Sequence, residues 1–328
     1  MNKILVTGAT GFLGGHLLNH LREWCPTANL RILARSGRAG ESHPDVEVVR
    51  GDICDREAVR KAVRGASRVY HLAGLVSREP ADAPALYRTH VEGTRHLCDA
   101  ALEFGVEKVV LVSSSGASAV SPAPVVHRED APFANDVVGR WPYYLSKIFQ
   151  EKLALSSHRG RGLPVVVVNP SLLLGPGDQS GRSIRDVMLF LRKKIFGVPP
   201  GGLNFVDVRD AAAAVVAAME KGAPGERYFV GGPNWTFAQF FARLEALSGL
   251  KGPRVRFSPA MSAWSARLAP ACRALAPRLF PLTPTEIEMA SHFWYLDSAK
   301  ARETLGFSSR DPDETLRATI EDARRLLS

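Results

Sequence analysis

Three side chains in the middle of the sequence could together move a proton on and off a substrate oxygen: Ser115, Tyr143 and Lys147. Tyr143 and Lys147 are four residues apart, so a helix would place them on one face, one turn apart. A tyrosine has an ordinary pKa of about 10, and a neighbouring ammonium group or an oxidised nicotinamide would favour the phenolate and lower that pKa. Tyr143 could then donate a proton to a carbonyl or take one from an alcohol, while Ser115 stabilises the oxygen.

The surroundings of these residues matter, because a tyrosine and a lysine at this spacing also occur by chance on solvated helices. Ser115 closes a serine triplet that follows the apolar run Lys108–Val112, which predicts a strand. In open α/β sheets ligands bind at the carboxyl ends of the strands, so the serines would face the same crevice as Tyr143. Tyr144 is a competing candidate, but no lysine follows it at the same spacing.

A glycine-rich turn at the amino end could hold the dinucleotide that such a reaction needs. Gly8, Gly11 and Gly14 stand between the apolar run Ile4–Val6 and the helix-like segment Phe12–Leu21. In a strand–turn–helix of this kind the glycines permit the tight turn, the approach of a pyrophosphate and the close packing of helix on strand. The free N–H groups at the start of the helix then face the phosphates. A plain structural turn is the alternative.

The elements that must position these residues alternate along the chain. Near-continuous Val, Ile and Leu runs predict strands that are buried on both faces, with helix-like segments between most of them. This alternation predicts an α/β fold of the Rossmann type, a doubly wound parallel sheet with helices on both sides. The expected strands are Ile4–Val6, Leu30–Ala34, Val46–Val49, Val69–Leu72, Lys108–Val112 and Val165–Val168, and the expected helices include Glu57–Arg64, Ala85–Phe104 and Tyr143–Ser157.

The pattern changes after Pro170, where a helix is expected over Val187–Phe196. Phe205–Val208, an alanine-rich helix over Arg209–Lys221 and Arg227–Val230 are expected to return to the same sheet. The remaining sequence is typical of helices and predicts a smaller, mostly helical substrate domain at the carboxyl end. The expected division is residues 1–170 plus 203–230 for dinucleotide binding, and 171–202 plus 231–328 for substrate binding.

The segment Pro259–Leu282 has two interpretations. Pro270 and Pro277 would interrupt a long helix, so we expect two short helices packed on the substrate domain. Alternatively, the segment is an apolar lid over a hydrophobic substrate or a patch that touches a membrane. Its apolar residues recur at helical spacing with arginines between them: Met261, Trp264, Leu268, Cys272, Leu275 and Leu279, with Arg267, Arg273 and Arg278.

The 328 residues are 45% hydrophobic and 23% charged, as in an ordinary soluble globular protein. The formal net charge is +9, but the basic residues are spread along the chain without interleaved aromatics, which disfavours nucleic acid as a partner.

The four cysteines form no CxxC pair, so neither a metal site nor a disulfide framework is expected; they are Cys25, Cys54, Cys98 and Cys272. No apolar run reaches the roughly 18 residues of a membrane-spanning helix, and we expect a cytoplasmic protein.

The position that usually selects the dinucleotide holds Arg35. NAD-binding folds of this type usually carry an acidic residue at the end of the second strand, where it binds the ribose 2′-OH. Arg35 stands there, with Arg38 just after it, and an arginine can hydrogen-bond a 2′-phosphate. We therefore favour NADP(H), while NAD(H) stays possible because Arg35 could instead stack on the adenine. Asp52 and Ile53 could bracket the adenine, and the small residues of Leu72–Gly74 would lie against the cofactor.

Taken in order, these motifs resemble the extended short-chain dehydrogenases/reductases. The resemblance covers essentially the whole chain. Near the carboxyl end, Leu282–Pro284 and Phe293–Ala301 are similar to a dihydroflavonol-reductase-like and hopanoid-associated epimerase-like subgroup, with 3β-hydroxysteroid dehydrogenases as more distant relatives. The other motifs that carry the resemblance are Thr7–Gly14, Gly51–Ile53, His71–Gly74, Ser113–Ser115, Tyr143, Ser146–Lys147, Asn169–Ser171, Gly175–Asp178 and Phe205–Asp210.

The resemblance implies an enzyme in which Ser115, Tyr143 and Lys147 are catalytic and Tyr143 and Lys147 also touch the cofactor. It implies a homodimer through the helices Ala85–Phe104 and Tyr143–Ser157. The remaining implied cofactor contacts are Gly8, Thr10, Gly11, Phe12, Leu13, Arg35, Asp52, Ile53, Leu72, Ala73, Gly74 and Pro170.

One position departs from the family pattern. The family usually has Asn before the Val-x-Gly-Thr of the helix after the fourth strand, whereas this chain has His90. The histidine could replace the amide in packing or relay protons. We favour a structural, hydrogen-bonding role, because titratable residues often serve one.

The sequence is consistent with three functions. The favoured one is a reductase or dehydrogenase that transfers hydride between NADP(H) and a carbonyl/alcohol pair of a small or medium, fairly apolar substrate. The alternative is a nucleotide-sugar epimerase or dehydratase with retained NAD; its substrate diphosphate could bind Arg182, Arg185, Arg192, Lys193 and Lys194. The third, a nucleotide-binding protein without turnover, is disfavoured by the intact Ser/Tyr/Lys set. The apolar residues expected around the pocket are Leu172, Leu173, Phe190, Phe196 and Trp264.

Overall fold

The structure, a computed structural model, describes residues 3–24, 29–35, 45–276 and 282–328. Its centre is a parallel sheet that has seven strands in this part of the chain, in the order β10-β6-β5-β4-β1-β2-β3. The strand order reverses between β1 and β4, and ligands of doubly wound sheets bind at such a point. The fold class expected from the sequence is therefore confirmed. The strands are β1 (Lys3–Thr7), β2 (Asn29–Ala34), β3 (Glu47–Arg50), β4 (Ala66–His71), β5 (Lys108–Val112), β6 (Val165–Pro170) and β10 (Arg227–Val230).

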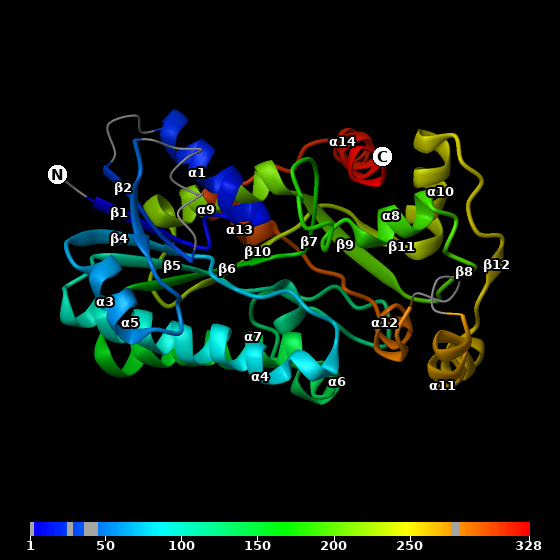
Figure 1. Ribbon diagram of the computed structural model, residues 1–328, viewed down its shortest axis with the longest axis horizontal. Coiled ribbons are helices and arrows are strands. Elements are labelled where there is room, and N and C mark those ends of the chain that lie inside the picture. Colours follow the sequence, from blue (N-terminus) through cyan, green and yellow to red (C-terminus); the bar gives the residue numbers. More distant parts are fainter. Residues whose placement is uncertain (1–2, 25–28, 36–44, 277–281) are drawn as a thin grey trace.

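Helices cover both faces of this sheet (Figure 1). Because successive side chains of a strand point to opposite faces, Val6 and Tyr70 join the core on one side, while Leu5 and Val69 join the core on the other. Both faces are therefore apolar, as the Val-rich runs predict. The first side is covered by α1 (Phe12–Trp24), α9 (Val208–Lys221) and α13 (Ala299–Leu305), and the second by α3 (Arg56–Val63), α5 (Gly93–Glu103) and α7 (Pro142–Arg161).

The helix expected over Ala85–Phe104 contains a wider turn. It begins as α4 (Ala83–Tyr87), continues as the π-helical segment η2 (Arg88–Glu92) and ends as α5, with helical backbone angles at both junctions. Single π-helical turns inside α-helices occur frequently at functional sites. This one carries His90, which is buried.

A second, smaller sheet lies beside the first. In the described residues it has the order β11-β9-β7, formed by β7 (Leu172–Leu174), β9 (Gly202–Asp207) and β11 (Asn234–Thr236). The prediction that Phe205–Val208 returns to the main sheet is therefore wrong, and only β10 returns to it, beside β6. The apolar pattern of a buried strand does not reveal its partner, and β9 pairs with the strand that leaves the main sheet after Pro170.

A third core lies under the small sheet, where Leu203 and Phe205 pack with α8 (Arg185–Leu191), α10 (Phe237–Ser248) and α14 (Pro312–Leu327). The division into two domains stays a prediction; Leu203 and Phe205, which it assigned to the dinucleotide-binding part with 203–230, belong to this third core. Helix α8 ends at Leu191 rather than Phe196, because Lys193 has φ 55°, a left-handed conformation that ends a helix. The other short elements are η1 (Pro80–Asp82), η3 (Ser115–Ala117), α6 (Asn135–Val138), β8 (Gly197–Val198), β12 (Val255–Arg256) and α12 (Pro284–Met289).

The segment after β12 forms one helix, α11 (Pro259–Leu275), beside α12. The expectation of two short helices is wrong, because the helix runs through Pro270. A proline removes one helical hydrogen bond, and the neighbouring turns hold the helix together here. Pro277, Arg278 and Leu279 lie outside the described residues. In the described ranges, none of the helices combines the length and apolarity needed to cross a bilayer.

Candidate active site

The turn between β1 and α1 is shaped by the absence of side chains. Gly8 has φ 75°, and a Cβ on it would lie 2.6 Å from the backbone of Leu72 and Ala73. A Cβ on Gly14 would lie 2.0 Å from the Gly8 carbonyl oxygen, and that oxygen accepts a hydrogen bond of 3.0 Å from the Gly11 N–H. The backbone is thus held close to the end of β4, and the start of α1 faces the space beyond it. This geometry fits the pyrophosphate of a dinucleotide.

A cavity of about 390 Å³ extends from this turn to the serine triplet, α7 and the small sheet. The proposed catalytic residues Ser115, Tyr143 and Lys147 all line it. Of the proposed cofactor contacts, those that line it are Gly8, Gly11, Phe12, Leu13, Leu72, Gly74, Tyr143, Lys147 and Pro170, whereas Thr10, Arg35, Asp52, Ile53 and Ala73 lie outside the lining.

The two residues expected near the adenine end share one edge of the main sheet. The Gly51 N–H donates to the Ala34 carbonyl at 3.1 Å, which brings the ends of β2 and β3 together. Arg35, just after β2, is exposed, and Asp52 accepts a hydrogen bond of 2.8 Å from the Cys54 N–H. Arg35 can therefore reach a group at this edge without breaking a buried contact. Arg38 lies outside the described residues.

Ile53 and Ala73 have structural contacts. Ile53 is buried and packs so closely on α5 that a Cβ on Gly93 would lie 2.9 Å from it. The Ala73 N–H donates to the Thr7 hydroxyl at 3.2 Å, which fixes the end of β4 against β1. Both residues position the backbone around the cavity.

Lys147 is buried on α7 with its ammonium group fixed by two acceptors. It donates to the Val112 carbonyl at 3.2 Å and to Gln150 Oε1 at 2.9 Å. Burial lowers the pKa of Lys147 to about 8, and the carboxylate of Glu151 acts in the opposite direction. The amine is therefore mostly protonated at neutral pH. Its pKa is nevertheless close enough to neutral pH for it to exchange a proton.

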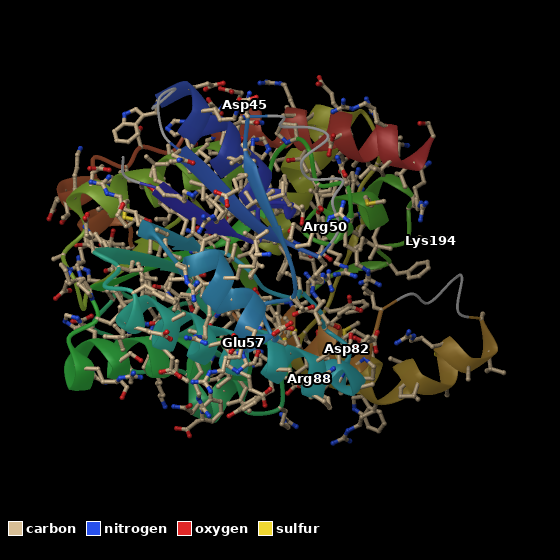
Figure 2. All side chains as sticks on the ribbon, turned by 60° about the vertical axis from the view of Figure 1, so that its left-hand side comes forward. Asp45, Arg50, Glu57, Asp82, Arg88 and Lys194 are labelled. Atoms are coloured by element: carbon tan, nitrogen blue, oxygen red, sulfur yellow. The ribbon has the colours of Figure 1, made fainter. Side chains whose placement is uncertain are left out.

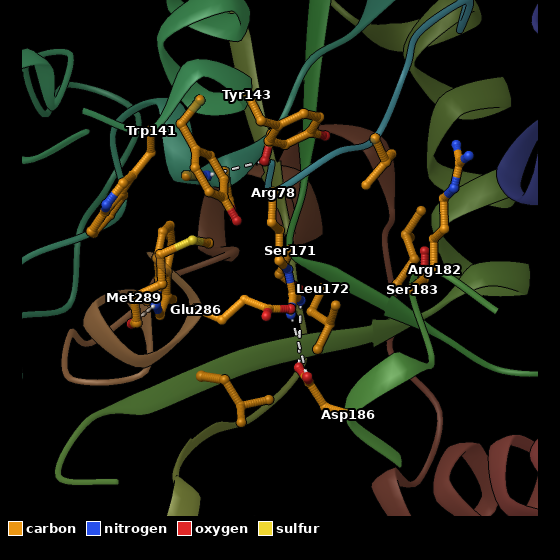
Figure 3. Close-up of a pocket in the computed structure, with 18 of the residues that line it drawn as sticks. Arg78, Trp141, Tyr143, Ser171, Leu172, Arg182, Ser183, Asp186, Glu286 and Met289 are labelled. Carbon is orange, nitrogen blue, oxygen red and sulfur yellow. Dashed lines mark hydrogen bonds and ion pairs between the residues drawn. The ribbon is translucent and has the colours of Figure 1, made fainter. Parts of the chain in front are cut away.

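Burial also dominates Tyr143, whose pKa it raises, with the neighbouring Tyr144 adding to the rise. The expectation that Lys147 lowers the pKa of Tyr143 is wrong for the protein without a dinucleotide, because the ammonium group donates its hydrogen bonds to Val112 and Gln150. The Ser114 hydroxyl contacts the Tyr143 phenol and partly offsets the rise in its pKa. Figure 3 shows the Tyr143 ring at the wall of the cavity.

A chain of buried hydrogen bonds, which no motif in the sequence predicted, leads from Lys147 to the first strand. Gln150 Nε2 donates to Thr94 Oγ1 at 2.9 Å, and Thr94 Oγ1 lies 2.8 Å from His71 Nε2. His71 Nδ1 lies 2.7 Å from Thr7 Oγ1, and burial lowers the pKa of His71 to about 3. The spacing of Lys147 and Gln150, three residues apart on one helical face, was the available signal.

His90 is fully buried between the turn after β4 and α7. Its Nε2 accepts a hydrogen bond of 3.1 Å from the Leu75 N–H, so its Nδ1 carries the proton toward Ser146 Oγ, 2.8 Å away. Burial and the nearby Lys147 hold the pKa of His90 well below its ordinary value. The geometry matches the structural role that we favour for His90.

A second buried network supports the serine triplet. Arg227 Nε lies 2.5 Å from Glu151 Oε1, and Asn169 Nδ2 donates to Glu151 Oε2 at 2.7 Å. Asn169 Nδ2 also donates to the Ser114 carbonyl at 3.2 Å. Glu151 and Asn169 thereby connect α7 to the end of β5.

The far side of the cavity is largely apolar. Among the residues predicted there, Leu172 and Leu173 line it. The prediction is wrong for Phe190, which stacks behind Phe241 at 5.9 Å, and for the exposed Phe196 and Trp264. The fold supplies other aromatic residues that are distant in sequence: Phe237, Phe240, Phe241, Phe257 and Trp294.

A group of charged side chains interrupts this apolar wall. Arg78 reaches across the cavity to Asp186 at 3.3 Å and Glu286 at 3.4 Å (Figure 3). Arg185 pairs with the same Glu286. Of the five basic residues considered for a substrate diphosphate, Arg182 lines the cavity, while Arg185 is engaged with Glu286.

A doubly wound sheet with a glycine turn, a serine triplet and a Tyr/Lys pair on one cavity defines the class of dinucleotide-dependent enzymes. The chain belongs to the NAD dependent epimerase/dehydratase family, whose model matches residues 4–231. It is 34% identical over 330 residues to sterol demethylase protein B of Methylococcus capsulatus, covering 97% of this chain and 96% of that protein. It is 30% identical over 332 residues to a putative dihydroflavonol 4-reductase of Synechocystis, covering 97% and 92%. The solved structure of gox2253 superposes with a TM-score of 0.81 at 30% identity, covering 99% and 98% of the two chains.

Proposed function

We propose that this protein is a reductase or dehydrogenase that transfers hydride between NADP(H) and a carbonyl/alcohol group of a small or medium, fairly apolar substrate. The observation that carries the proposal is one cavity with the glycine turn and Tyr143 on one side and aromatic residues on the other. The names of two relatives, which mention a sterol and a dihydroflavonol, point to apolar ring systems as substrates.

The proton chemistry belongs to the chain itself, while the dinucleotide supplies or accepts the hydride when bound. The raised pKa keeps Tyr143 protonated at neutral pH, so the phenol is ready to donate a proton to a carbonyl oxygen. Ser115 and Ser114 line the same space and can hydrogen-bond that oxygen as its charge develops. Lys147 lines the same cavity, and its pKa of about 8 allows it to return a proton to the phenol.

We also propose a preference for NADP(H), supported by the exposed Arg35 at the end of β2. Its guanidinium could bind a 2′-phosphate, whereas an acidic residue would repel one. The alternative, a nucleotide-sugar epimerase or dehydratase with retained NAD, is kept because the family includes both activities. This is the weaker proposal, because only Arg182 of the five basic residues considered for the diphosphate lines the cavity in the described part of the chain.

A titration of nucleotide-stripped protein with NADPH and NADH, followed by nicotinamide fluorescence, tests the proposal first. We expect exchangeable binding that is tighter for NADPH, and NADPH oxidation with ketones of a fused-ring type. Tightly held NAD that survives purification, together with conversion of a nucleotide sugar, would establish the alternative instead.

We propose further that the protein is a homodimer through the helical path 83–103 and α7. Tyr87 and Phe149 are exposed on these helices, and their rings pack together at 5.6 Å. Sedimentation of the wild type and of Tyr87→Ser/Phe149→Ser tests this: we expect a dimer that the double substitution dissociates, and a monomeric wild type would contradict it.

A further inference from the structure

Helix α11 exposes a stripe of large apolar side chains. Met261, Trp264, Leu268 and Leu275 have relative exposures of 47%, 63%, 57% and 87%. Their spacings of three, four and seven residues place them on one face of the helix. The opposite face carries Ser262 and Ala269, which are buried. The helix is thus amphipathic in the unusual sense that its large apolar residues face outward.

The charge of this part of the chain has one sign. Between Glu245 and Glu286 the sequence has no acidic residue, and its basic residues there are Lys251, Arg254, Arg256, Arg267, Arg273 and Arg278. Arg267 lies beside the stripe, with its guanidinium 5.6 Å from the centre of the Trp264 ring. A tryptophan and leucines flanked by arginines are the residue types that bind at the interface of an anionic bilayer.

The position of α11 connects this stripe to the cavity. Ser262, on the inner face, lines the cavity, and so do Thr285 and Met289 of the adjacent α12. In Figure 2 α11, in gold, projects from the body of the molecule with side chains pointing away from it. A surface that receives the stripe would therefore lie next to the substrate side of the cavity.

We propose that α11 docks on an anionic lipid surface, with Met261, Trp264, Leu268 and Leu275 inserted at the interface and Arg267 paired with lipid phosphates. The geometry of docking places the aromatic side of the cavity near the bilayer, from which an apolar substrate could enter. Docking itself goes beyond the proposed function and does not depend on it, because vesicle binding is measured without substrate or dinucleotide.

Two other occupants fit the observations less well. The residues of α11 include arginines and no acidic residue, so a second copy would bring like charges together; the contact of Arg273 with Glu79, at 4.0 Å, offsets only part of this repulsion. A lid over the cavity would need the large apolar residues to face inward, but Trp264 is exposed on the face opposite Ser262. The one-signed charge favours an anionic surface.

Co-sedimentation of the full-length protein with vesicles tests the proposal. We expect binding to vesicles of phosphatidylcholine with 30% phosphatidylglycerol to be on the order of tenfold stronger than to pure phosphatidylcholine, and weaker at high salt. Trp264→Ser/Leu268→Ser should reduce it by on the order of tenfold or more, while circular dichroism and the melting temperature stay unchanged. Trp24→Ser, at a tryptophan that is 54% exposed at the end of α1, is the matched control and should bind as the wild type does.

The charge contribution has its own pair of variants. Arg267→Gln/Arg273→Gln should weaken binding to the anionic vesicles by on the order of tenfold, whereas Arg317→Gln/Arg325→Gln on α14 should not. Equal binding to neutral and anionic vesicles, or binding that survives loss of Trp264 and Leu268, would overturn the proposal. So would self-association of the wild type that Trp264→Ser/Leu268→Ser abolishes without any binding to vesicles.

Discussion

The imidazole of His90 and the hydroxyl of Ser146 lie 2.8 Å apart and connect the π-helical segment to α7. Ser146 in turn donates to the Tyr143 carbonyl at 2.7 Å, so the contact lies within the turn that carries Tyr143 and Lys147. The second imidazole nitrogen accepts from the Leu75 N–H. His90 therefore holds the chain after β4 and the start of α7 at a fixed separation, as a neutral group.

The first prediction concerns acid stability. The unfolded chain takes up a proton on His90 near pH 6.5, whereas burial keeps the folded form neutral to much lower pH. The free energy of unfolding therefore falls as the pH drops below about 6.5, by at most about 1.4 kcal/mol per pH unit for this one group. His90→Asn, whose amide can keep both hydrogen bonds, should reduce this fall, as measured by urea denaturation at pH 7.5, 6 and 5.

The matched control is His20→Asn, a partly exposed position on α1, which should keep the wild-type dependence on pH. An unchanged acid response of His90→Asn would show that His90 does not cause it. A large loss of stability of His90→Asn at pH 7.5 would show that the asparagine does not reproduce the two contacts.

The second prediction concerns the proton donor. Tyr143→Phe should keep dinucleotide affinity within about twofold and lower kcat by roughly 10²- to 10⁴-fold, because the ring packing remains and the acid is removed. Steady-state kinetics and a nucleotide titration measure the two effects. Tyr144→Phe is the control, since no lysine follows Tyr144 at a spacing of four residues. Normal turnover of Tyr143→Phe would refute the assignment.

The third prediction separates two serines. We expect Ser115→Ala to lower kcat/KM by 10- to 1000-fold, because it removes a hydrogen bond to the substrate oxygen. Ser114→Ala should mainly change the pH profile, because Ser114 contacts the Tyr143 phenol. If the larger loss of kcat/KM follows Ser114→Ala, the substrate oxygen lies at Ser114 instead.

The fourth prediction concerns cofactor choice. Arg35→Asp should shift the ratio of NADPH to NADH affinity toward NADH by about tenfold or more, because a carboxylate repels a 2′-phosphate and accepts from a ribose hydroxyl. Lys61→Asp, at an exposed lysine of α3, makes the same charge change elsewhere and should leave the ratio unchanged. A constant ratio in Arg35→Asp would remove Arg35 from the site.

The fifth prediction uses two adjacent glycines of α1. A Cβ at Gly14 would lie 2.0 Å from the Gly8 carbonyl, whereas one at Gly15 would lie 4.0 Å from the Ala9 carbonyl. Gly14→Ala should therefore distort the turn, cost about 1–3 kcal/mol of stability and lower dinucleotide affinity at least tenfold. Gly15→Ala should fold normally and gain up to about 1 kcal/mol from its helix propensity. Equal melting temperatures and affinities of the two variants would contradict the close approach.

The sequence by itself determined the main sheet, the glycine turn and the positions of Ser115, Tyr143 and Lys147. These features depend on short-range patterns: apolar runs for buried strands, a spacing of four for one helical face, and glycines where a Cβ would meet backbone. It also indicated Arg35 at the end of β2, since strand ends follow from the same runs.

Only the tertiary structure decided which groups meet across long separations in the sequence. The pairing of β9 with β7, the contact of Gln150 with Thr94 and the reach of Arg78 to Asp186 join residues whose local patterns say nothing of one another. The same holds for protonation, because burial raises the pKa of Tyr143 where a neighbouring lysine predicted a fall. The outward face of α11 was decided in the same way: periodicity shows that a helix has an apolar face, but the surrounding fold determines whether that face is covered.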